Sequence, residues 1–148
     1  MTALSRPAGP VAVAVGDVLP EQSMTLTVQR LVMIAAANRD FAPTHHDVAV
    51  ARATGAGNPY GNMMFVMALF ERTALGWAGP AARLRALRSV RMAAFNEAGL
   101  TVTCRGLVST VDPAARLVGL ELGLFAQDGT QTASGVAEVE LPAGVRLG

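Results

Sequence analysis

Residues 61–77, GNMMFVMALFERTALGW, decide the fold, because their apolar side chains fall on every face of a helix. A helix that is apolar all round must be buried on all sides. The glycine and proline of WAGP, residues 77–80, end this helix. The sequence therefore predicts one long central helix enclosed by the rest of the chain.

After this helix the hydrophobic period changes to two, which is typical of half-buried strands. Apolar residues alternate with polar or small ones in the runs 100–105, 118–124 and 137–141. Asp112-Pro113 and Asp128-Gly129 lie between the runs as turn signals, and the second is typical of a tight hairpin. We expect these three strands to form an antiparallel meander.

A buried helix and a following antiparallel sheet can bury their apolar faces against each other if the sheet curls around the helix. This α+β arrangement is the hotdog fold. The 148 residues suffice for one domain of ordinary size, which we place over residues 16–148. Residues 1–15 mix proline, glycine and small residues and are expected to form a flexible arm.

Between arm and central helix the pattern predicts a strand over residues 23–27 and a helix over residues 28–38. Pro43 disfavours helical backbone at the preceding residue, so residues 40–47 should form a shaped loop. Asp47 is expected to cap a short helix after this loop.

Composition excludes several classes of protein. Hydrophobic residues are 51% of the chain and charged residues 16%, which indicates a packed core. The net charge of +1 favours neither nucleic acid nor a membrane surface. Cys104 has no disulfide partner, no zinc motif is present, and no apolar run approaches the length of a membrane span. We expect a cytoplasmic protein without signal peptide, metal or cofactor.

The two histidines, His45 and His46, are adjacent in the loop between Asp40 and Asp47. A histidine beside a carboxylate in a semi-buried loop can move protons near neutral pH, because the carboxylate fixes its tautomer and raises its basicity. The alternative is that Asp47 only caps a helix and the histidines are solvated. Spacing alone leaves both interpretations open.

The loop RDFAPTHHD, residues 39–47, resembles that of MaoC-like hydratases and (R)-specific enoyl-CoA hydratases. Their pattern is Asp, Phe or a similar residue, Asn-Pro, any residue, His, any residue, Asp. The resemblance implies a catalytic dyad of Asp40 and His45, and its terminal Asp falls on Asp47, a candidate substrate-binding residue. His46 occupies a position that is usually apolar and is not expected to be the catalyst. Ala42 stands where the pattern has Asn.

The resemblance extends to the start of the central helix, where the family has a His-Gly-Met-like motif and this chain has Tyr60-Gly61-Asn62. We expect the N–H of Gly61 to be the oxyanion donor, because unpaired N–H groups gather at a helix start and glycine allows close approach. Tyr60 and Asn62 are candidate substrate-binding residues. Asn62 is equally well interpreted as a residue that satisfies the helix end.

The pattern RDF…HHD and the later FERTALGWAGP are similar to the small MaoC-like subunit of the bacterial steroid side-chain enoyl-CoA hydratase. That subunit carries the dyad and pairs with a second MaoC-like subunit. The resemblance implies a lyase of lipid metabolism and steroid degradation that hydrates a bulky enoyl-CoA thioester, or catalyses the reverse dehydration. It also implies a homodimer, or a heteromer with a second MaoC-like chain.

Two other functions remain open. The chain could be a non-catalytic partner that shapes another subunit's tunnel, although such a subunit has no need of Asp40 and His45. It could be a hotdog thioesterase, but the central helix offers only Glu71 as a carboxylate, near its far end. Four arginines could meet CoA phosphates or lie exposed on a strand: Arg83, Arg85, Arg88 and Arg91.

Overall fold

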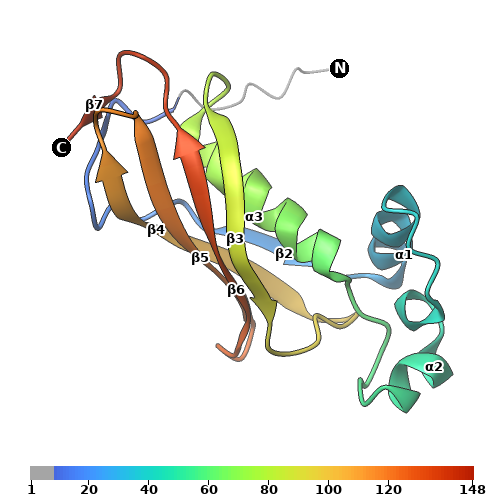
Figure 1. Ribbon diagram of the computed structural model, residues 1–148. Helices are drawn as coiled ribbons and strands as arrows, with labels where there is room; N and C mark the ends of the chain where they lie inside the picture. The colour runs from blue at the N-terminus through green and yellow to red at the C-terminus, as the bar shows by residue number, and fades with distance from the viewer. Residues whose placement is uncertain (1–8) are drawn as a thin grey trace, which may run out of the picture.

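The computed structural model describes residues 9–148, so the first part of the expected arm lies outside the described residues. The elements, in chain order, are β1 (Ala12–Val13), β2 (Gln22–Thr25), α1 (Val28–Ala37), the 3-10 turn η1 (Pro43–His45), α2 (Val48–Ala53), α3 (Met63–Ala78), β3 (Arg83–Met92), β4 (Thr101–Asp112), β5 (Leu117–Ala126), β6 (Gln131–Glu140) and β7 (Arg146–Leu147). Figure 1 shows α1 and α2 together at one end of the molecule, with β7 at the other.

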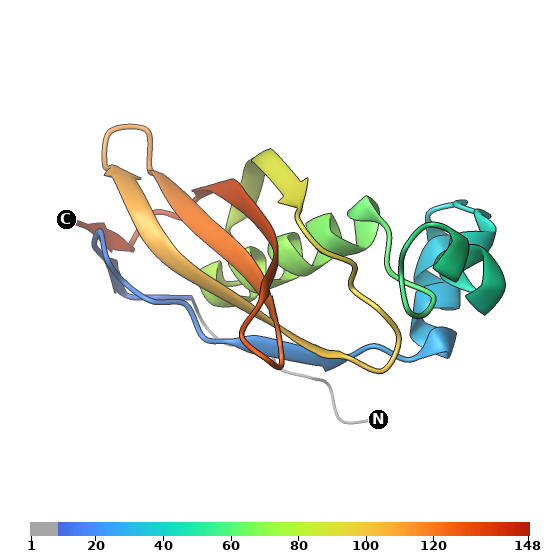
Figure 2. The ribbon, with the colours of Figure 1, turned by 90° about the horizontal axis from the view of Figure 1, so that it is seen from below.

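Five strands form one antiparallel sheet in the order β2-β4-β5-β6-β3. Helix α3 packs along one face of this curved sheet (Figure 2). The apolar residues on its sheet side, Phe65, Val66, Leu69 and Phe70, are buried in the same core as the inward-facing residues of β4, β5 and β6. The structure confirms the α+β hotdog fold and the meander of β4, β5 and β6.

A further strand, β3, follows the central helix and was absent from the predicted meander. It pairs with β6, and the register shifts between Leu84 and Ala86 and again between Arg88 and Arg91. Each bulge inserts an extra residue and so interrupts the alternation of side chains. The period of two is therefore broken in the sequence of β3, which conceals a strand at the sheet edge.

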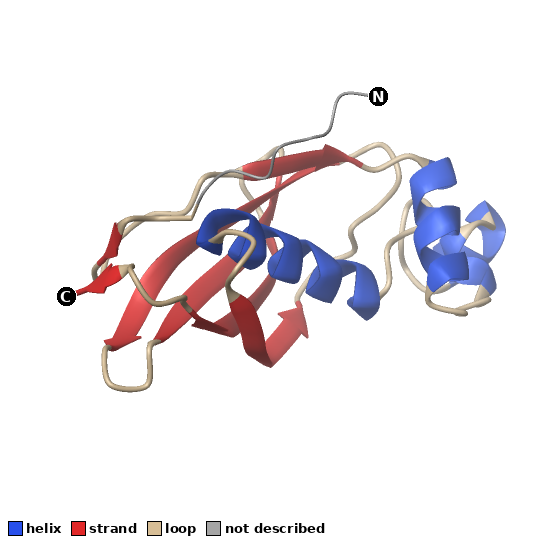
Figure 3. Cartoon of the chain, turned by 90° about the horizontal axis from the view of Figure 1, so that it is seen from above, coloured by secondary structure: helices blue, strands red, loops and turns tan. Residues whose placement is uncertain are grey.

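Helix α3 is not enclosed on every side, contrary to the expectation from its composition. Residues Met64, Ala68 and Glu71, spaced along one side of the helix, are exposed. The open sheet lies against only one side of α3 (Figure 3). The uncovered side of α3 is therefore apolar at its start, at Met63 and Met64, and charged further along, at Glu71.

Within residues 9–15 the structure also differs from the expected arm. Ala12–Val13 pairs in parallel with Arg146–Leu147. Val13 is 2% exposed and belongs to the hydrophobic core. Apolar burial attaches this segment to the fold, although its small residues gave no periodic signal.

Candidate active site

Asp40 and His45 lie on the connection between α1 and α2, at the end of the molecule beyond the sheet. The N–H of Asp40 donates to the carbonyl of Ala35 in the last turn of α1, at 2.9 Å. Pro43 then opens the short turn η1, which buries the ring of His45. The Asp40 side chain is 36% exposed. The loop thus presents a half-exposed carboxylate beside a buried imidazole.

Hydrogen bonds fix both nitrogens of the His45 ring. Nδ1 lies 2.7 Å from the carbonyl oxygen of Tyr60, and Nε2 lies 3.0 Å from Oδ2 of Asp40. A carbonyl oxygen can only accept, so Nδ1 must carry a proton. Nε2 is therefore the nitrogen that exchanges a proton with the carboxylate, and the two residues expected to form the dyad are in direct contact.

Asp40 receives two more hydrogen bonds. The amide Nδ2 of Asn62 donates to Oδ2 at 2.9 Å, and the N–H of Ala42 donates to Oδ1 at 3.3 Å. The bond from Asn62, followed by those from Ala42 and His45, holds the pKa of Asp40 below its ordinary value, because each stabilises the charged carboxylate. Asp40 is thus prepared to act as an anion.

Asn62 satisfies the helix end, one of the two roles that the sequence left open, and its amide also reaches Asp40. Its Oδ1 accepts the N–H of Phe65 at 2.9 Å, which makes Asn62 the N-cap of α3. Its Nδ2 points into the site at Asp40. Direct contact with substrate, as the motif implied, stays a prediction.

Tyr60 serves His45 through its backbone and its ring. Besides the carbonyl contact, the ring stands edge-on to His45, with centroids 5.9 Å apart and planes at 83°. The ring of Tyr60 also packs against that of Phe95, with ring centroids 4.5 Å apart. The phenol oxygen lies 3.3 Å from Oγ1 of Thr54. Tyr60 therefore forms a wall behind the dyad, and its role in substrate binding stays a prediction.

We expect Tyr60→Phe to keep kcat/KM within about threefold of the wild-type value, because the carbonyl that orients His45 belongs to the backbone and the long phenol contact contributes little. Tyr60→Ala, which removes the ring packing as well, is the matched comparison. Steady-state hydration kinetics of both variants provide the measurement. A large loss in Tyr60→Phe alone would show that the hydroxyl acts on the substrate.

The expected oxyanion role of Gly61 needs correction. Its N–H already donates to the carbonyl of Asn96, at 2.9 Å, and α3 begins two residues later, at Met63. A Cβ at Gly61 would lie 2.6 Å from Cδ1 of Phe65. Glycine is therefore required here for packing, and its N–H holds the chain in place.

Asn96 was not identified from the sequence, because AAFNEAG has no period or motif. It lies in the connection between β3 and β4 and is fully buried, and its Oδ1 accepts the hydroxyl of Thr132 at 2.7 Å. Next to it, the N–H of Ala98 donates to the carbonyl of Pro59 at 2.8 Å. This connection therefore anchors the segment that supports His45.

Asp47 has a structural role. Its Oδ1 accepts the N–H groups of Ala49 and Val50, at 2.8 and 3.1 Å, and so caps α2 as expected. Across residues 9–148, no hydrogen bond or ion pair links Asp47 to the dyad. The adjacent His46 is exposed. Substrate binding by Asp47 stays a prediction without structural support.

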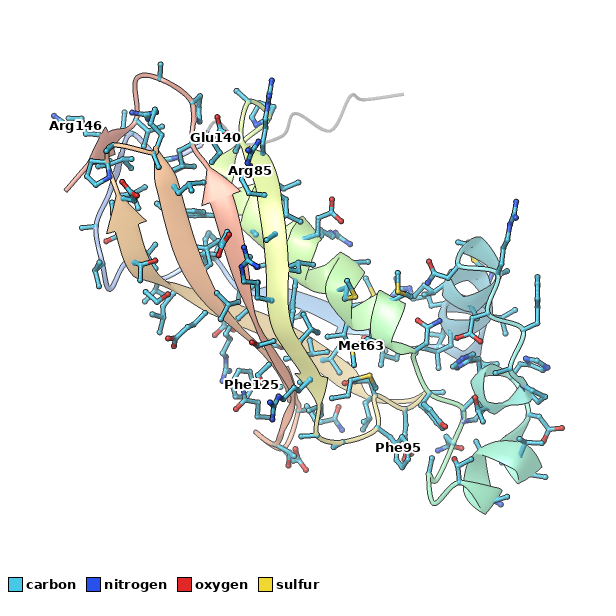
Figure 4. All side chains as sticks on the ribbon, in the orientation of Figure 1. Met63, Arg85, Phe95, Phe125, Glu140 and Arg146 are labelled. Carbon is cyan, nitrogen blue, oxygen red and sulfur yellow. The ribbon has the colours of Figure 1, made fainter. Side chains whose placement is uncertain are left out.

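Two of the four arginines on β3 pair with glutamates of β6. Arg85 Nη1 lies 3.3 Å from a carboxylate oxygen of Glu140, and Figure 4 shows both residues near one end of the sheet. Arg88 bonds both carboxylate oxygens of Glu138, at 2.6 and 3.1 Å. These pairs favour the interpretation of the arginines as exposed strand residues over a phosphate site.

Other features of the described residues lie away from the dyad. A cavity of about 620 Å³ opens on the sheet face opposite α3, beside Arg105 and Phe125. Residues 9–148 contain no cluster of three side chains suited to a metal ion. No helix in the same range has both the length and the apolarity needed to cross a membrane.

Comparisons with known proteins agree with this geometry. No family model matches the sequence. The chain is 35% identical over 98 residues to the 3-oxo-4,17-pregnadiene-20-carboxyl-CoA hydratase beta subunit of Mycobacterium tuberculosis, covering 66% of this chain and 75% of the relative. A chain of the ChsH1–ChsH2 complex of M. tuberculosis superimposes with a TM-score of 0.80 at 29% identity, over 86% of this chain and 98% of the other.

The R-hydratase PhaJ1 of Pseudomonas aeruginosa superimposes with a TM-score of 0.77 at 25% identity, over 88% of this chain and 83% of that protein. The hydratase relative agrees with the fold and with the loop that contains Asp40 and His45. The chain therefore belongs to the MaoC-like hydratase family.

Proposed function

We propose that this chain is the catalytic subunit of an enoyl-CoA hydratase, with Asp40 and His45 as the groups that move protons. The observation that carries the proposal is the 3.0 Å contact between Nε2 and Oδ2, with Nδ1 fixed by a backbone carbonyl. A base and an acid held together in this way suit the addition of water across a polarised double bond. The curated relative is a subunit of such a hydratase.

The reaction also needs a donor for the thioester oxygen, where negative charge develops. The first N–H groups of an α-helix lack partners within the helix. Asn62 caps the N–H of Phe65, so we assign the oxyanion to the preceding N–H groups of α3, those of Met63 and Met64. They are the first two residues after Asn62, which contacts Asp40.

A second MaoC-like subunit, identical or different, is proposed to complete the groove. Apolar residues that adjoin the dyad or its supports are exposed, namely Phe41, Met63 and Phe95. Figure 4 places Met63 and Phe95 at the end of the sheet that faces α1 and α2. Exposed apolar surface of this kind marks an interaction site, and one structural relative is a chain from a complex of two proteins.

The two rival functions have less support. A non-catalytic partner would not need the hydrogen bonds that fix both ring nitrogens of His45. For a thioesterase, Glu71 is the carboxylate on α3, and it is exposed two turns beyond the dyad end of the helix.

The acyl group is proposed to be bulky and steroid-like, as in the substrate named for the curated relative. The unbranched thioethers of Met63 and Met64 adapt to irregular apolar shapes. We expect the complex co-purified from the native host to hydrate 3-oxo-4,17-pregnadiene-20-carboxyl-CoA with a higher kcat/KM than crotonyl-CoA. The isolated chain, which has half a groove, is the comparison. Faster hydration of crotonyl-CoA by the full complex would refute the steroid-like substrate, and no hydration of any enoyl-CoA would refute the proposed function.

A further inference from the structure

Two side-chain nitrogens converge on one oxygen of Asp40. Oδ2 lies 3.0 Å from Nε2 of His45 and 2.9 Å from Nδ2 of Asn62. The helix fixes which end of the Asn62 amide faces Asp40, because its Oδ1 must accept the N–H of Phe65. The end that faces Asp40 can therefore only donate.

The hydrogen bonds also fix how many protons the dyad shares. Nδ1 of His45 keeps its proton for the carbonyl of Tyr60. The short contact between Nε2 and Oδ2 then requires one proton, which sits on the ring or on the carboxyl group. With the proton on Nε2, the carboxylate is charged and the bond from Asn62 is charge-assisted and strong. With the proton on Oδ2, Asn62 faces a neutral and weaker acceptor.

We propose that Asn62 is a positioning residue that keeps the shared proton on His45, so that Asp40 accepts the proton of water and His45 donates to the substrate. This assignment rests on the proposed hydratase function and specifies its direction of proton flow. It gives a role in the site to a residue that would otherwise be only a helix cap.

The resulting step balances. The oxygen of water bonds to the β-carbon of the enoyl thioester while the Asp40 carboxylate takes one proton of that water. The electron pair of the double bond forms the new C–H bond at the α-carbon with the proton from Nε2 of His45. The dyad ends as a carboxylic acid and a neutral imidazole. Return of the proton from Asp40 to His45, which the Nε2–Oδ2 contact allows, restores the starting state.

The surroundings of Asp40 leave Asn62 as a major influence on its charge. From η1, His45 is its ion-pair partner among residues 9–148. From its own loop the N–H of Ala42 donates, and from α3 comes the uncharged Asn62. In agreement with the geometry, the bond from Asn62 is the largest cause of the lowered pKa of Asp40.

Substitutions at Asn62 can separate its two roles. Asn62→Ser keeps an N-cap side chain but removes the amide that reaches Asp40. Asn62→Asp keeps the cap and the size, but sets a second carboxylate against Asp40. Thr27→Ala is the matched control, because Thr27 caps α1 by accepting the N–H of Arg30 and, within residues 9–148, makes no hydrogen bond to Asp40 or His45.

We expect Asn62→Ser to lower kcat/KM of the complex by about tenfold and to shift the acidic limb of its pH profile upward, because loss of the donor raises the pKa of Asp40. Asn62→Asp should shift the limb further, since like charges disfavour ionisation. Thr27→Ala should leave the limb in place. Unfolding midpoints of all variants exclude loss of fold as the cause.

Nitrogen-15 NMR of the imidazole ring gives a measurement independent of catalysis, and a His46→Gln background leaves His45 as the chain's single histidine. We expect both ring nitrogens to be protonated with Asn62 present, and Nε2 to move toward neutral imidazole in Asn62→Ser. Unchanged nitrogen shifts in Asn62→Ser would overturn the role of Asn62. The predicted shifts in a complex that hydrates no enoyl-CoA would instead overturn the hydratase proposal and leave the proton placement standing.

Discussion

Asp40→Asn and His45→Ala are each expected to lower kcat/KM for enoyl-CoA hydration by roughly 10³-fold. The amide of the first variant cannot take the proton of water, and the second variant has no imidazole to donate a proton to the α-carbon. Both residues lie between α1 and α2 and are not members of the hydrophobic core, so the fold should persist. Kinetics of the complex and circular dichroism of each variant are the measurements.

Combining the two substitutions should cost little beyond either one, because groups that act as a unit lose their function together. His46→Ala is the control, since His46 is exposed next to the dyad. Near-wild-type turnover in either single variant would refute the dyad. A comparable loss in His46→Ala would transfer the role to that neighbour.

Phe70→Ala is expected to lower the free energy of unfolding by about 3–5 kcal/mol, through lost transfer energy and the cavity that remains. Phe70 is 0% exposed, on the sheet side of α3. A Cβ added at Gly135 of β6 would lie 3.0 Å from its ring, so strand and helix are already in close contact. Urea unfolding at fixed protein concentration provides the measurement.

Phe41→Ala is the matched control for this prediction, because the same ring is removed from a position that is 75% exposed. It should change the free energy of unfolding by less than about 0.5 kcal/mol. Equal effects of the two substitutions would contradict the assignment of α3 as the core helix. Its neighbour Asp40 makes Phe41 unsuitable as a control for activity, so only stability is compared.

Periodicity made the centre of this fold predictable. Helix α3 and the strands β4, β5 and β6 were identified because burial on one or both faces imposes periods of 3.6 or 2 on the sequence. Strand β3 was not among the three predicted half-buried strands, because its bulges break that period, and only its spaced arginines indicated an exposed strand. The loop pattern also singled out Asp40 and His45, whose side chains are in contact in the structure, while their catalytic role stays a prediction.

What the sequence could not supply are contacts between distant segments. The N–H of Gly61 was expected to face a substrate, yet it is held by Asn96, thirty-five residues further along the chain. The bond from Asn62 to Asp40 spans 22 residues. Neither pair has a local pattern, because a hydrogen bond between loops depends on where the sheet places them. The candidate site residues could therefore be predicted from the sequence, whereas their hydrogen-bond partners could be identified only from the folded structure.

The anchoring of Gly61 by Asn96 has a consequence for the order of folding. The hairpins β4–β5 and β5–β6 join neighbouring segments and close short loops, so they can form early. The segment of Gly61 becomes fixed only when Asn96 is in place. Asn96 follows β3, which must first pair with β6, and it is held by Thr132 of β6. Closing long loops is slow because of their entropy. We therefore expect the contacts that support His45 to be among the last to form, so that a newly synthesised chain completes its sheet before its candidate active site.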